Sequence, residues 1–134
     1  MKIDGACHCG AIKYEAEIDP EAVRLCHCSD CQNFSGGAFR TVVLVSEDNL
    51  TVLSGAPKEY VKIGDSGNQR IQAFCGTCGA GFHSTSVGDG PKVYSLRLGT
   101  ARQRNELVPK SQIWTRSAQA WLGDIDSIPK SEKA

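Results

Sequence analysis

The stretch CHCSDC, residues 26–31, places three cysteines within six residues. The chain holds seven cysteines, and the other four form two further pairs, Cys7 with Cys9 and Cys75 with Cys78. A closed structural zinc site takes four protein ligands, whereas a catalytic zinc site takes three and leaves one position free. Seven cysteines in three short clusters therefore predict a small fold organised around metal sites.

Length and charge are those of one ordinary globular domain. With 134 residues the chain can bury a core, and we expect a single domain over residues 1–134. Fifteen Lys and Arg residues balance fifteen Asp and Glu residues, so the net charge predicts no nucleic-acid partner. No stretch is apolar for the length of a membrane span, so we expect a cytoplasmic protein without a membrane partner.

A disulfide framework is the first alternative for the cysteines. Cytosolic thiols are kept reduced, and an odd number of cysteines leaves one thiol unpaired. One residue separates the two cysteines in Cys7/Cys9 and in Cys26/Cys28, so a disulfide within either pair would close a very short ring. The reducing cytosol and the odd number of cysteines both favour metal ligation over disulfide bonds.

The apolar residues predict a fold made mostly of strands. Residues 11–18 alternate, with Ile12, Tyr14, Ala16 and Ile18 on one face and charged residues on the other. Further strand-like runs follow between Gly, Pro, Asn and Asp punctuation, at residues 22–28, 39–45, 50–53, 59–63, 70–75 and 92–98. The fold class expected is therefore mainly β in a single domain.

Two short helices are expected. The first follows Cys28, with Ser29 or Asp30 as its cap, and ends at the Ser-Gly-Gly of residues 35–37. The second runs through residues 117–122. We expect Trp114 and Trp121 to cap the β core.

The four outlying cysteines predict a structural zinc site. Cys75-Gly-Thr-Cys78-Gly is typical of a zinc knuckle, in which glycines let backbone amides turn toward the sulfurs. Two pairs of thiolates, Cys7/Cys9 and Cys75/Cys78, complete a tetrahedral site that joins the two halves of the chain.

Cys26, Cys28 and Cys31 remain, and they predict a second zinc with an open position. Such a site suits the attack of a thiol on a small electrophile, or the reverse cleavage of a carbon–sulfur bond, because zinc keeps a thiol ionised near neutral pH. The prediction is therefore two Zn²⁺ per chain.

Other interpretations of these residues stay open. A single zinc with three spare cysteines is the main one, and a redox Cys-x-x-Cys pair is another. His27 could complete the second site, although adjacent residues of extended backbone point to opposite faces, which favours a His27 that does not ligate. His83 could move a proton near the metal, or could simply be a packed strand residue.

The sequence resembles the glutathione-dependent formaldehyde-activating enzyme (Gfa) family, whose domain also occurs in centromere protein V. The resemblance rests on five motifs in the family's order: GACHCGAIKYEA, LCHCSDCQNFSGGAF, RIQAFCGTCGAGF, YSLRLGT and QIWTRSAQAWL. It covers residues 2–122, leaving 123–134 as a C-terminal tail, and includes all seven cysteines. Gln112 stands where a histidine commonly precedes Ile-Trp in the family.

The resemblance implies stacked, twisted antiparallel sheets of the β-tent type. It also implies the same division of cysteines: a structural zinc on Cys7, Cys9, Cys75 and Cys78, and a second zinc on Cys26, Cys28 and Cys31. The family's reaction is the addition of glutathione to formaldehyde, giving S-hydroxymethylglutathione, or its reverse, which makes its members carbon–sulfur lyases.

The expected partners are a small thiol such as glutathione and an aldehyde. Ser35 and the amides of Gly36 and Gly37 are candidate donors to the oxyanion formed on the aldehyde oxygen. Arg40, Arg70 or Arg97 could hold the carboxylates of the thiol. The alternatives are a non-enzymatic zinc-stabilised binding module and a thiol or metal sensor.

Overall fold

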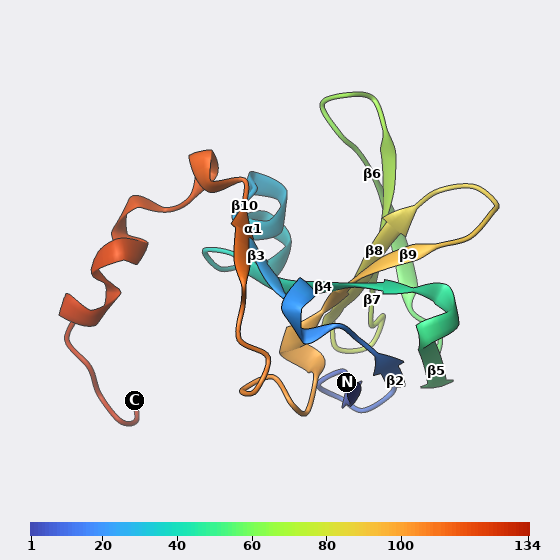
Figure 1. Ribbon diagram of the computed structural model, residues 1–134, viewed down its shortest axis with the longest axis horizontal. Coiled ribbons are helices and arrows are strands. Elements are labelled where there is room, and N and C mark those ends of the chain that lie inside the picture. The colour runs from blue at the N-terminus through green and yellow to red at the C-terminus, as the bar shows by residue number, and fades with distance from the viewer.

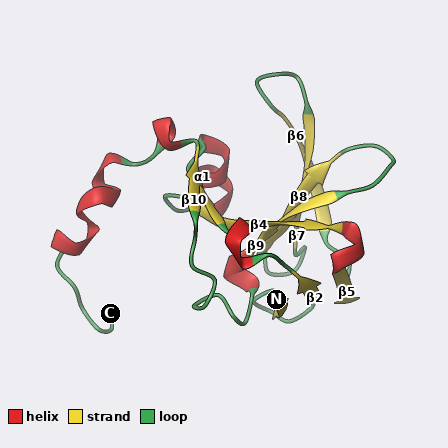
Figure 2. Cartoon of the chain, in the orientation of Figure 1, coloured by secondary structure: helices red, strands yellow, loops and turns green.

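The computed structural model describes residues 1–134 as two β-sheets with short helices between the strands (Figure 1, Figure 2). The smaller sheet has three strands in the order β1-β2-β5, and the larger has seven in the order β10-β3-β4-β9-β8-β7-β6. Every pairing is antiparallel except that of β10 with β3. The predicted mainly β fold of antiparallel sheets is confirmed.

The ten strands are short, as the spacing of turn residues predicts. Their bounds are β1 Lys2–Ala6, β2 Lys13–Glu17, β3 Arg24–Cys26, β4 Arg40–Ser46, β5 Leu50–Ser54, β6 Lys58–Ile63, β7 Gln69–Phe74, β8 Gly81–Ser86, β9 Val93–Arg97 and β10 Ser111–Ile113. One α-helix, α1, spans Ser29–Ser35. Five 3₁₀ segments complete the chain: η1 Pro20–Ala22, η2 Glu47–Asn49, η3 Leu98–Thr100, η4 Thr115–Ser117 and η5 Ala120–Ser127.

The core is one cluster of buried residues contributed by both sheets. From the smaller sheet Tyr14 buries its ring, which lies 5.2 Å from the ring of Phe82. From the larger sheet Val43 and Leu96 are fully buried as directly opposed residues of β4 and β9. Ile12, Ala16 and Ile18 are buried with Tyr14, so the predicted alternation of residues 11–18 is confirmed.

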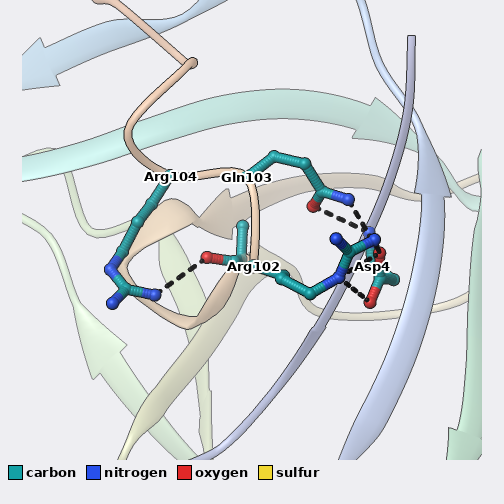
Figure 3. A network of polar contacts seen from close by, with 5 residues as sticks. Asp4, Arg102, Gln103 and Arg104 are labelled. Atoms are coloured by element: carbon teal, nitrogen blue, oxygen red, sulfur yellow. Dashed lines mark hydrogen bonds and ion pairs between the residues drawn. The ribbon is translucent and has the colours of Figure 1, made fainter.

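Residues 101–104 cover the outer edge of β1. Ala101 forms an isolated bridge with Gly5, and the Arg102 amide donates to the Asp4 carbonyl. The Asp4 carboxylate accepts hydrogen bonds from Arg102 Nε (3.0 Å to Oδ2) and from Gln103 Nε2 (2.7 Å to Oδ1), as Figure 3 shows. A β-carbon on Gly5 would lie 2.4 Å from the Thr100 carbonyl oxygen, so this close approach requires glycine. The edge is therefore closed to further strand pairing.

Helix α1 forms where it was expected, but its cap is different. Cys28, not Ser29 or Asp30, is the N-cap, since its sulfur accepts a hydrogen bond from the Cys31 amide. The helix ends at Gly36, whose φ of 67° provides the left-handed cap. The longest helical segment, η5, has eight residues, and none of the helices could span a bilayer.

The C-terminal segment departs from two predictions. Residues 117–122 form parts of the 3₁₀ segments η4 and η5 and not an α-helix. Trp114 is 51% exposed and Trp121 is 48% exposed, so neither caps the core. The physical reason is that the chain after β10 runs away from both sheets (Figure 1), while Leu98 and Leu107 fill the core instead.

Candidate functional site

The four outlying cysteines meet where the turn between β1 and β2 lies against the turn between β7 and β8. Their sulfurs all lie within 4.8 Å of one another, with Cys7 to Cys9 at 3.6 Å and Cys9 to Cys75 at 3.7 Å. A tetrahedron with Zn–S bonds of about 2.3 Å separates its sulfurs by about 3.8 Å, whereas a disulfide needs about 2.05 Å. All seven cysteines are free thiols, and this four-sulfur cluster fits a zinc ion.

In each of the two turns that carry this cluster, a glycine amide donates back to the carbonyl of a cysteine. The Gly10 amide donates to the Cys7 carbonyl, and the Gly79 amide donates to the Cys75 carbonyl. Both glycines have φ near 80°, a conformation that other residues rarely adopt. The turns aim backbone amides at the sulfurs: Ile12 donates to Cys7 Sγ at 3.2 Å, and a hydrogen bond from the Ala80 amide helps lower the pKa of Cys78 to about 6.

The remaining cysteines lie together at the other end of the larger sheet. Cys26 ends β3, Cys28 caps α1 and Cys31 lies in the first turn of that helix. Their three sulfurs lie within 4.8 Å of one another, and no histidine or carboxylate belongs to the group. This three-sulfur cluster offers the soft donors that zinc prefers, with one tetrahedral position left without a protein ligand.

The three-sulfur cluster favours one thiolate even without an ion. The Cys31 thiol hydrogen-bonds to the Cys26 sulfur, which lowers the pKa of Cys26 to about 5 and raises that of Cys31. The Cys28 amide also donates to Cys26, and the positive charge of Arg97 acts in the same direction. The surroundings therefore stabilise negative charge on sulfur.

Beside this cluster lie arginines that have no acidic partner. Arg97 is 9% exposed and donates to Gln72 Oε1 at 3.0 Å and to Ser95 Oγ at 3.2 Å. Arg40 lies opposite Cys26 in the pairing of β3 with β4 and donates to the same Gln72 oxygen at 3.4 Å. Burial lowers the pKa of Arg97 to about 10. No carboxylate lies within 4.0 Å of either guanidinium, so both charges can meet an anionic ligand.

Arg70, the third arginine predicted to hold a carboxylate, is half-buried farther along the same sheet. It donates to Ser84 Oγ at 3.4 Å and likewise has no acidic partner. Ser35 and Gly36 are already engaged. The Gly36 amide donates to the Gln32 carbonyl at 3.0 Å, and Ser35 Oγ lies 3.4 Å from the Phe39 carbonyl. Oxyanion binding by these residues remains a prediction that no contact supports.

The two buried histidines lie outside the sulfur clusters. His27 is 2% exposed, and its Nε2 lies 2.7 Å from Gln112 Oε1 on β10, so this ring ties β3 to β10. His83 is opposite the core residues Ala73 and Leu96, and its ring lies 4.4 Å from that of Tyr94. Burial, aided by the charge of Arg97, lowers the pKa of His83 to about 4, so this side chain is neutral at physiological pH.

A crevice of about 320 Å³, which the sequence did not predict, lies next to the three-sulfur cluster, since Arg40 lines it and pairs with Cys26. Phe34 of α1 and Tyr60 of β6 line it as a tilted pair of rings with centroids 6.0 Å apart, and Arg40 and Gln72 also line it. Its one sequence signal is the pair of aromatic residues among polar neighbours. A larger groove of about 1010 Å³, lined by charges of both signs on β1 and β2, contains no cysteine.

Comparisons with known proteins give a family for the chain. Residues 2–117 match the family model described as "Glutathione-dependent formaldehyde-activating enzyme". Over 57 residues the chain is 32% identical to a Halomonas elongata protein named "Putative glutathione-dependent formaldehyde-activating enzyme", a match that covers 42% of this chain and 36% of that protein. The chain therefore aligns with about a third of the length of that curated relative.

A solved structure shares the fold. The crystal structure of a Rhodobacter sphaeroides protein matches with a TM-score of 0.61 at 24% sequence identity. The match covers 84% of this chain and 99% of that one. The two-sheet architecture described above is thus one that an experimental structure also adopts.

Proposed function

Because the chain belongs to the glutathione-dependent formaldehyde-activating enzyme family, we propose that it is a zinc-dependent carbon–sulfur lyase. In this proposal it adds a small thiol, glutathione or a similar one, to an aldehyde such as formaldehyde, and catalyses the reverse cleavage. The observation that carries the proposal is the three-sulfur cluster, which offers three converging ligands and no protein group for the fourth position.

The two clusters would have different roles. Cys7, Cys9, Cys75 and Cys78 would hold a structural zinc, and Cys26, Cys28 and Cys31 would hold the second. Zinc, when bound there, supplies Lewis-acid chemistry that keeps a thiol ionised near neutral pH. The sulfur separations of 3.6 and 3.7 Å match a zinc tetrahedron and support the first assignment, and the convergence of three sulfurs within 4.8 Å of one another supports the second.

The residues around the three-sulfur cluster would bind and orient the thiol. Arg97 and Arg40 present guanidinium groups without acidic partners, and a guanidinium can bind a carboxylate through two parallel hydrogen bonds. Gln72 holds both arginines through one oxygen, which fixes their planes relative to the sheet. A glutathione-like thiol carries two carboxylates, so this pair suits its charge.

The reaction balances as an addition. A bond forms between sulfur and the carbonyl carbon, the π bond of the aldehyde breaks, and the proton lost by the thiol ends on the oxygen. The positive charges of Arg40 and Arg97 would stabilise the negative charge that develops on that oxygen. The reverse reaction returns the proton and cleaves the carbon–sulfur bond.

The test is an exchange measurement on purified, zinc-containing protein. Magnetisation-exchange NMR of glutathione with formaldehyde should show faster interconversion with S-hydroxymethylglutathione when the protein is present. Cys28→Ala should abolish the acceleration, and His8→Ala, a change in an exposed residue outside the three-sulfur cluster, should not. No acceleration by the wild-type protein would refute the enzyme and leave a binding module or a sensor.

A further inference from the structure

We propose that the crevice between α1 and β6 selects an aldehyde with an aromatic or similarly large apolar substituent. This inference rests on the proposed function, because it names the carbonyl substrate of the same site. The first observation is the size of the crevice. The crevice measures about 320 Å³, roughly ten times the 30 Å³ that one water takes up in the liquid. Formaldehyde, with two non-hydrogen atoms, would leave most of this space unfilled.

The walls of the crevice are those of an apolar ligand site. Phe34, Tyr60 and Phe74 are aromatic, Ala73 and Gly79 are small and uncharged, and Arg40 and Gln72 are the polar residues of the lining. Phe34 is 40% exposed and Tyr60 is 55% exposed, and their rings form a tilted pair with centroids 6.0 Å apart, so together they present one exposed aromatic surface to the crevice. An aromatic ring packed against this surface could make the tilted and offset contacts that such rings prefer.

The geometry of the walls is fixed by contacts outside the crevice. Asp30 of α1 forms an ion pair with Lys62 of β6, which holds the helix across the edge of the sheet. Tyr60 lies directly opposite Gln72 in the pairing of β6 with β7. The crevice is thus preformed, which limits the entropy lost when a ligand binds.

The charge of the crevice fits an aldehyde. Arg40 is its one charged lining residue, and its guanidinium lies 5.3 Å from the centre of the Phe34 ring. Arg40 is also the residue opposite Cys26, so it marks the boundary between the crevice and the three-sulfur cluster. A carbonyl group at this boundary would place its oxygen near the guanidinium and its apolar substituent against the rings of Phe34 and Tyr60. A tripeptide thiol, with two carboxylates and an ammonium group, matches these walls less well.

The first experiment measures binding without turnover. Saturation-transfer NMR with benzyl alcohol, which has the ring but no aldehyde, should show transfer from the zinc-containing wild-type protein. Tyr60→Ala should weaken this binding about fivefold, in line with the loss of one aromatic contact. Ile63→Ala is the matched control, because Ile63 is a 71% exposed residue of the same strand outside the crevice. Equal binding by wild type and Tyr60→Ala would overturn the inference.

The second experiment compares two aldehydes with glutathione. The ratio of kcat/KM for phenylacetaldehyde to that for formaldehyde should exceed one in wild type, fall about fivefold in Tyr60→Ala and stay unchanged in Ile63→Ala. Acceleration with formaldehyde alone would overturn this inference and leave the proposed function intact. Acceleration with neither aldehyde would overturn the proposed function itself, and with it the choice of substrate.

Discussion

The four-sulfur and three-sulfur clusters use the same kind of ligand and differ in what surrounds them. The first joins residues about seventy positions apart in the sequence, and its neighbours are backbone amides. The second is contained within residues 26–31, and its neighbours include the charges of Arg40 and Arg97. The four-sulfur cluster therefore connects two distant turns. The three-sulfur cluster is a local motif that lies beside two arginines and the crevice.

This difference indicates a division between fold and chemistry. An ion in the four-sulfur cluster would close a long loop and hold β1 and β2 against β7 and β8, so its binding energy would contribute to folding. An ion in the three-sulfur cluster would hold the short segment from β3 to α1, which backbone pairing and the Cys28 cap already fix. Loss of the first should unfold the chain, and loss of the second should not.

The largest effect is expected for Cys75→Ala. Cys75 is 2% exposed and belongs to the core cluster, so the change removes both a ligand and buried contacts. Structural zinc sites contribute apparent binding energies of about 10–16 kcal/mol, comparable to the whole stability of a domain. We expect loss of the cooperative thermal transition, followed by circular dichroism. A folded Cys75→Ala protein with an unchanged melting temperature would contradict the structural role of this cluster.

A smaller loss of stability is expected at acid pH from His83, a residue of β8. The folded-state pKa of His83 is about 4, below the ordinary value of 6.5, so the unfolded chain binds a proton first as the pH falls. His83 therefore withdraws stability between pH 6.5 and 4, by a total on the order of 3 kcal/mol. This loss of stability at His83 adds to any loss caused by protonation of the cysteine thiolates.

The matched variant is His83→Gln, which removes the titrating ring and keeps a polar side chain of similar reach. Urea unfolding of both proteins between pH 7 and 4 should show a shallower loss of stability in the variant. Parallel curves for the two proteins would refute the assignment of the pH dependence to His83. Zinc content measured at each pH separates this contribution from metal release, which both proteins share.

A third and smaller effect is expected at Arg97, whose charge lies beside the three-sulfur cluster. Removing the positive charge of Arg97 should weaken metal retention by the three-sulfur cluster, because one compensating charge beside its thiolates is lost. In Arg97→Met we expect about tenfold faster release of one metal ion to a coloured chelator and an unchanged rate for the other. Arg97→Lys keeps the charge and should behave much more like wild type. Faster release of both metal ions would mean that Arg97→Met had loosened the whole fold.

Much of this fold could be predicted because its signals are local. Alternation located the buried face of β2, and the residues after Cys28 predicted α1. The Cys28 cap was missed because a thiol is a less usual cap than the hydroxyl or carboxylate of its neighbours. The exposed Trp114 and Trp121 were misplaced, since apolar character predicts burial but not where the body of the fold ends.

The crevice could not be predicted from the sequence for a different reason. Phe34 and Tyr60 belong to separate elements, and only the docking of α1 across β6 brings their rings within 6.0 Å. The parallel pairing of β10 with β3 is likewise a long-range contact, between residues 111–113 and 24–26. Periodicity describes each element alone and carries no information about such contacts.

The division between the clusters is tested most directly by the zinc content of purified, untagged protein beside that of Cys31→Ala. We expect two zinc ions per chain in wild type and one in Cys31→Ala, with a melting temperature that changes by only a few degrees. One zinc in both proteins would mean that the three-sulfur cluster binds no metal. In that case the enzyme proposal would lose its main support.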